Sequence, residues 1–237
     1  MEKTHLPATN IVYFFIGVLI CSLIGFHFTY TMRFPTFEGL SVAHHFHGAT
    51  LMLWFLMLIV QPILIRKKKF ALHRKVGKIS YLLVPLILFS IFWVTKVSYL
   101  RNIASQPQEE VIGGLALDIP TIFIFGSFYF LAMLNRRNSA AHMRYMVGTS
   151  LLMIGPGLGR ALIIFGGISF PMAIIYTTYF AEFIAILFII NDYIKGNSIK
   201  PYLTILFGLL FLHACWIFKM TALSQWFGSF FAKVFFE

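Results

Sequence analysis

Charged residues are scarce in this 237-residue sequence. Only 11% of its residues are Asp, Glu, Lys or Arg, and just 8 of these are acidic, whereas about 25% charged residues is usual for a soluble domain. Hydrophobic residues make up 59% of the chain, and Phe alone occurs 28 times. The lack of charge excludes an ordinary water-soluble domain and indicates an integral membrane protein.

Cysteine is nearly absent as well. The two cysteines, Cys21 and Cys215, lie in apolar segments far apart in the chain. They do not have the spacing of a disulfide framework or a zinc ribbon. We interpret both as small buried hydrophobic side chains.

The apolar residues form continuous runs and not short alternating segments, which excludes membrane-spanning strands. A run of roughly 20 apolar residues crosses the bilayer as a helix, because every backbone polar group must be satisfied internally. The chain is therefore predicted to be all-α, a single domain (1–237) built as a polytopic bundle of seven transmembrane helices. The expected spans are 11–32, 40–65, 78–100, 116–134, 144–167, 170–191 and 202–222. Residues 224–237 are too short to cross and rich in aromatic side chains, so they are predicted to lie in the membrane interface.

The net charge of +11 is concentrated between spans, in "RKKKFALHRKVGK" (66–78) and "NRRNSAAHMR" (135–144). This distribution is typical of cytoplasmic loops of membrane proteins and argues against nucleic-acid binding. The prediction is a multi-pass protein of the inner (plasma) membrane, with a cytoplasmic N-terminus and the C-terminus outside. Its expected partner is the lipid bilayer itself.

Ionisable residues inside the predicted spans are candidate functional residues, because they are costly in lipid. The stretch "GLSVAHHFHGATLMLWFLML" (39–58) places three histidines at the start of an apolar run. At a rise of about 1.5 Å per residue, several histidines fall roughly 6–13 Å below the outer boundary. The predicted metal ligands are His27, His44, His45, His47 and His213.

A cofactor interpretation adds two further residues. His44 and His47 are three positions apart and share a helix face with Trp54, so this face is predicted to point into the bundle. Arg160 follows the loosening stretch "GPGLG" in the fifth span and could neutralise an anionic group. The predicted cofactor-binding residues are His47, His213, Arg160 and Trp54.

Two carboxylic acids inside the spans are the candidate catalytic residues. Glu182 lies near the middle of the sixth span, and Asp118 lies at the start of the fourth. A carboxyl group at such depth is protonated or paired. Arg160, His213 or a metal ion could pair with Glu182.

The motifs "HGATLMLW" (47–54) and "LHRKVGK" (72–78) resemble the ascorbate-reducible, two-haem b-type transmembrane cytochromes. They are also similar to bacterial membrane proteins of unknown function with the same signatures. The resemblance covers about residues 44–90. It implies that His47 is an axial haem ligand and that His73 and His142 bracket an inner haem.

The chain departs from that family because its fourth span has no histidine. His47 therefore lacks its expected partner, and His213 or His27 would have to replace it. This departure favours a single haem b, or another transition metal, in the outer half of the bilayer. The expected function is then redox chemistry or electron transport, with a quinone or a lipid as candidate substrate.

Two other functions are left open by the sequence. One is a membrane-embedded zinc-dependent lipid hydrolase, in which Ser41, His45 and His213 resemble the pattern of seven-helix hydrolases and Glu182 or Asp118 acts as base. The other is a small-molecule transporter or sensor, which a strong inverted repeat or discontinuous helices would favour.

Overall fold

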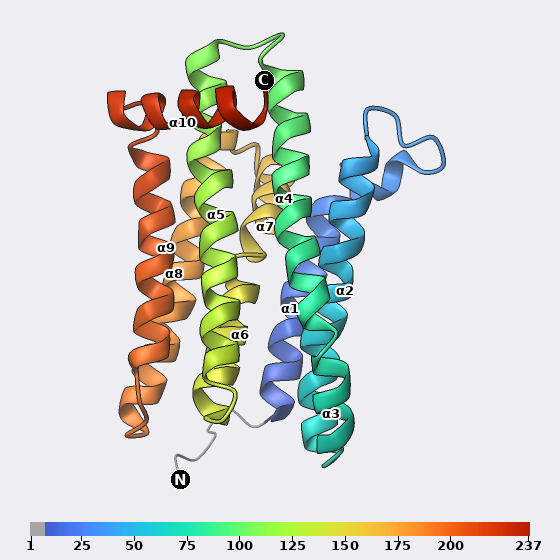
Figure 1. The fold of residues 1–237 in the computed structure, drawn as a ribbon, viewed down its shortest axis with the longest axis vertical. Helices are drawn as coiled ribbons and strands as arrows, with labels where there is room; N and C mark the ends of the chain where they lie inside the picture. The colour runs from blue at the N-terminus through green and yellow to red at the C-terminus, as the bar shows by residue number, and fades with distance from the viewer. Residues whose placement is uncertain (1–7) are drawn as a thin grey trace.

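The computed structural model describes residues 8–237, and these contain helices and no strand. Figure 1 shows long helices running side by side, crossed at one end by a perpendicular helix. The elements are α1 (Ala8–His27), the 3-10 turn η1 (Thr31–Arg33), α2 (Val42–Arg66), α3 (Phe70–Gly77), α4 (Ser80–Asn102), α5 (Gln108–Leu134), α6 (Ser139–Leu151), α7 (Ile154–Gly166), α8 (Phe170–Ile194), α9 (Lys200–Ile217) and α10 (Ala222–Phe235).

Seven stretches of the described chain are helical, long enough and apolar enough to cross a membrane. Five are the single helices α1, α2, α5, α8 and α9. The other two are composite, because α3 and α4 together form Phe70–Asn102, and α6 and α7 together form Ser139–Gly166. The predicted seven-span, all-helical fold is therefore confirmed for the described residues.

The helices form a closed bundle around a shared core. α1 packs on α2 and α7, α2 on α4, α4 on α5, α5 on α6 and α9, and α8 on α7 and α9. The core contains Trp54, Ile87, Phe128 and Ile205, each with an exposed fraction of 2% or less. We name the two ends of the bundle by what they carry. The basic end holds the connections 67–69, 135–138 and 195–199, and the α10 end holds α10 and the connections 28–41 and 103–107.

Several predicted boundaries are corrected. The third span begins at Phe70 and not at 78, the fifth begins at Ser139 and not at 144, and the seventh ends at Ile217 and not at 222. The first helix ends at His27, and the residues up to 32 form turns and the start of η1. The fourth span begins at Gln108, not at 116, so α5 has 27 residues. Pro107 caps it, and Glu109 and Glu110 occupy its first turn, where acidic side chains favour a helix start.

The fifth span is interrupted in the middle of the bundle. α6 ends at Leu151, and α7 begins at Ile154, since Pro156 has no N–H to donate to the preceding turn. Beyond the break, Gly157 lies against α1 so closely that a Cβ built on Gly25 would be 2.0 Å from the carbonyl oxygen of Gly157. α1 and α7 therefore cross with their backbones in direct contact.

α10 is the helix that lies across the bundle in Figure 1. Gly228 and Ala232 are buried, and Gly228 faces Ile112 of α5. On the other side Leu223, Trp226 and Phe230 are more than half exposed. This arrangement of one buried and one exposed apolar face agrees with the predicted interfacial role of residues 224–237.

Candidate functional site

His44 and His45 are held by neighbours close to them in sequence. Nδ1 of His44 lies 3.1 Å from the backbone nitrogen of Ser41 and 2.9 Å from its Oγ, completing a cap at the start of α2. Nδ1 of His45 lies 2.6 Å from the hydroxyl of Tyr30, and its ring packs edge-on against Phe37. Both imidazoles thus stabilise the packing of the start of α2 against the residues that precede it.

His47 faces the bundle, as the sequence predicts. Its Nδ1 lies 3.0 Å from Oγ of Ser90 on α4, and Thr50 donates to the same Oγ at 3.2 Å. Trp54, two turns further along α2, is completely buried and donates to Oγ1 of Thr149 on α6 at 3.2 Å. The polar stripe of α2 therefore ties α2 to α4 and α6.

Arg160 lies on α7 with its guanidinium 4.1 Å from the ring centre of Phe26 on α1. It donates to the carbonyl oxygen of Pro156 at 2.8 Å and interacts electrostatically with His47. His27 bonds within its own turn, with Nδ1 3.0 Å from Oγ1 of Thr31. Arg160 thus lies near His47 and His44, whereas His27 does not join them.

The two candidate catalytic carboxyl groups lie on different helices and do not share a site. Glu182 on α8 forms a hydrogen bond of 2.9 Å with Nδ1 of His213 on α9, and both side chains are buried. Asp118 lies inside α5 and interacts with Thr95 on α4. The predicted pairing of Glu182 with His213 is present.

The five predicted metal ligands do not form one cluster. Four of them lie on α1 and α2, whereas His213 lies on α9 next to Glu182. Within residues 8–237, no group of three or more His, Cys, Asp or Glu side chains is arranged to hold a metal ion. The described residues therefore do not provide the three protein ligands that a zinc site needs.

Two further histidines, His73 and His142, both lie at the basic end. His142, in the first turn of α6, has its Nδ1 2.8 Å from the carbonyl oxygen of Ala132. His73 lies on α3, where the side-chain amide of Gln61 contacts its Nδ1 and its carbonyl oxygen. The two imidazoles are close enough to interact electrostatically.

The helices that carry this pair approach from different sides of the bundle. α3 packs on α2 and α4, whereas α6 packs mainly on α5 and α9. Only the two Nε2 atoms remain for a shared ligand, since each Nδ1 already contacts a neighbouring group. The basic end thus offers two histidines from separate helices.

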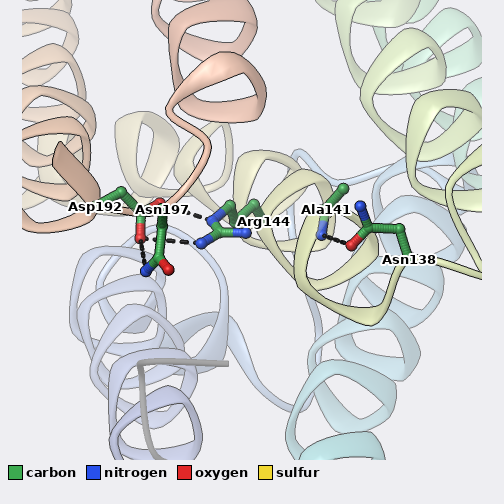
Figure 2. Close-up of polar contacts among 5 residues, drawn as sticks. All are labelled: Asn138, Ala141, Arg144, Asp192 and Asn197. Carbon is green, nitrogen blue, oxygen red and sulfur yellow. Dashed lines mark hydrogen bonds and ion pairs between the residues drawn. The ribbon is translucent and has the colours of Figure 1, made fainter. Parts of the chain in front are cut away.

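Figure 2 shows a buried ion pair between α6 and α8 that sequence reasoning missed. Arg144 on α6 donates to both carboxylate oxygens of Asp192 on α8, at 2.7 and 3.0 Å, and Asn197 donates to Asp192 at 3.1 Å. Arg144 ends the basic stretch 135–144, which the sequence places in a cytoplasmic loop, but it is only 2% exposed. The signal was its helical spacing from the apolar residues Ala141 and Val147, which share the buried face.

Comparison of the chain with protein-family models, with curated proteins and with solved structures finds no match. Any function proposed for this chain therefore depends on the geometry of its described residues.

Proposed function

We propose that this chain is a multi-pass redox protein of the inner membrane that holds one b-type haem between His73 and His142. The observation that carries the proposal is that α3 and α6 place these two histidines at the same end of the bundle, each with Nδ1 in contact with a neighbouring group. His47 and His213 both point into the bundle but bond to different partners, Ser90 on α4 and Glu182 on α8. His44 and His45 contact the residues that precede α2.

The donor set at the basic end fits a haem. A bis-histidine site needs two imidazoles on facing helices, each with Nε2 free. Donation from Nδ1 of His142 to the carbonyl of Ala132 is the usual way in which a metal-binding histidine is oriented. The amide nitrogen of Gln61 donates to Nδ1 of His73, so ligation through Nε2 would require this amide to turn and the ring proton to move from Nε2 to Nδ1.

Charge at the basic end supports the same assignment. Arg74 follows His73 directly and interacts with it electrostatically, and Arg136 lies near Tyr81 at the start of α4. Guanidinium groups bind carboxylates well, so these residues would neutralise the propionates. When bound, a haem supplies one-electron chemistry. The chain contributes the ligands and their orientation, and the Arg144–Asp192 pair fixes the helix that carries His142.

A visible spectrum of the purified protein, recorded reduced and oxidised, tests the proposal. We expect the Soret and α bands of a six-coordinate b-type haem and one iron per chain by elemental analysis. His142→Ala and His73→Ala should each abolish the low-spin spectrum, whereas His27→Ala should retain it because His27 bonds only within its own turn.

The same measurements discriminate the alternatives. Colourless protein without iron contradicts the haem proposal. Stoichiometric zinc in that protein would favour the lipid hydrolase.

A second candidate function is small-molecule transport, favoured by the interruption between α6 and α7 in the middle of the bundle. Discontinuous helices are typical of substrate sites in transporters. This function predicts colourless, metal-free protein, so one purification separates it from both other functions.

A further inference from the structure

The pair formed by Glu182 and His213 contains an atom that its neighbours leave unsatisfied. Each of the two residues is only 6% exposed, and Oε1 of Glu182 lies 2.9 Å from Nδ1 of His213. Among residues 8–237, the buried Nε2 of His213 has no hydrogen-bonding partner. Leaving a buried polar atom unpaired is costly, so a partner from outside the chain is expected there.

Whether that partner donates or accepts the hydrogen bond depends on which atoms of the pair carry protons. A net charge is costly inside a membrane, so the neutral pair is favoured. In one neutral form the carboxyl group donates to Nδ1, and the ring proton is on Nε2. In the other form, a carboxylate faces an imidazolium that is protonated on both nitrogens. Nε2 carries a hydrogen in both forms. A third neutral form, in which Nδ1–H donates to the carboxyl carbonyl, would leave the carboxyl O–H unpaired as well, because Glu182 bonds only to His213 among the described residues. The missing partner is therefore a hydrogen-bond acceptor.

The surroundings of His213 indicate how an acceptor would arrive. The ring of Tyr179 lies 4.6 Å from the imidazole at an interplanar angle of 80°. Tyr179 is 54% exposed, which on a spanning helix means that it faces the outside of the bundle. The side chain of Tyr179 therefore contacts both the imidazole and the lipid-facing side of the bundle. Molecules dissolved in the lipid offer carbonyl oxygens and few other acceptors.

We propose that Nε2 of His213 donates a hydrogen bond to a carbonyl oxygen of a membrane-dissolved molecule, which enters between α8 and α9 beside Tyr179. The carbonyl comes either from a quinone or from the acyl ester of a phospholipid. The site is independent of the proposed haem, since none of its residues contacts His73 or His142.

The experiment uses the full chain in nanodiscs of ether-linked phospholipid, which has no ester carbonyl. Decylubiquinone labelled with ¹³C at its carbonyls is titrated in, and its carbonyl stretch is followed by infrared spectroscopy. We expect saturable binding with a shift to lower wavenumber. His213→Phe should weaken binding at least tenfold, whereas the matched control His27→Phe should leave it unchanged.

Two arms complete the test. If decylubiquinone does not bind, ester-linked nanodiscs should show a shifted ester carbonyl band that His213→Phe removes, which assigns the site to lipid. Spectra that are identical in wild type and His213→Phe in both discs overturn the proposal. If His213→Phe does not fold, a photoreactive azido-quinone is applied to the wild-type protein instead. Labelling of residues outside α8 and α9 would overturn quinone binding at this site.

Discussion

At the scale of single residues, the buried polar side chains of this bundle act in pairs that join helices. His47 meets Ser90, Glu182 meets His213, and Arg144 meets Asp192. Removing one partner of a buried charged pair is far more costly than removing the pair, because the other charge stays buried. These contacts therefore determine which helix faces can turn inward.

The pair Arg144–Asp192 allows a direct test of this cost. Asp192→Asn should lower the free energy of unfolding by about 3–5 kcal/mol, because the buried guanidinium loses its carboxylate. Thermal unfolding in detergent measures the effect. Glu110→Gln is the matched control, since Glu110 is 54% exposed in its pair with Lys219 and should cost less than about 1 kcal/mol. Equal losses in both variants would contradict the structural role of Asp192.

At the scale of secondary-structure elements, the crossing of α1 and α7 is the tightest contact between helices. Small residues allow helix backbones to approach in membranes, where packing drives association. Gly25 and Gly157 provide that space, and the break before α7 allows the second half of the span to lean on α1. The crossing also positions Arg160 over Phe26.

Gly25→Ala should push α1 and α7 apart, because its Cβ would meet the carbonyl of Gly157 at 2.0 Å. Overpacking of this kind costs about 1–3 kcal/mol or more, which thermal unfolding detects. Gly17→Ala on the same helix has no neighbour within 4 Å and should leave the melting temperature unchanged or slightly higher. If both variants unfold alike, the close crossing is wrong.

The sequence predicts the spanning elements better than their ends. Continuous apolar runs were sufficient for seven spans, because length and hydrophobicity are local properties. The start of α5 was missed because its first turn contains the polar residues Gln108, Glu109 and Glu110. A search for apolar runs assigns such residues to a loop. Helix-capping chemistry, not hydrophobicity, determines that boundary.

The candidate site was only partly predictable for a different reason. The sequence singles out His47, Glu182 and His213, but which groups meet depends on packing between distant segments. Asp192 is 48 residues from Arg144, and no local pattern links them. A pairing of His73 and His142 is implied by the family resemblance, and spacing alone does not predict it.

At the scale of the whole molecule, the asymmetry of charge defines two different ends. Basic residues gather at the connections after α2, α5 and α8, whereas α10 and its exposed aromatic side chains cover the opposite end. By the positive-inside rule, we expect the basic end to face the cytoplasm. The proposed haem would then lie on the cytoplasmic side, and the Glu182–His213 pair would lie between it and the far surface.

Cysteine accessibility tests this orientation. In a background without Cys21 and Cys215, Gln106→Cys and Arg137→Cys place single thiols in exposed connections at opposite ends. A membrane-impermeant maleimide applied to intact cells should label Gln106→Cys and spare Arg137→Cys until the membrane is permeabilised. The reverse pattern would invert the assignment of both ends.

The way α10 docks has a practical consequence for anyone purifying the protein. Tyr99 donates to the side chain of Glu237 at 2.8 Å, and Lys96 donates to the carbonyl of Phe235 at 3.1 Å. An affinity tag fused directly after Glu237 would thus begin against α4 instead of in open solvent. A flexible spacer before the tag would keep the tag accessible to the resin. It would also leave Phe235 and Glu237 packed against α4.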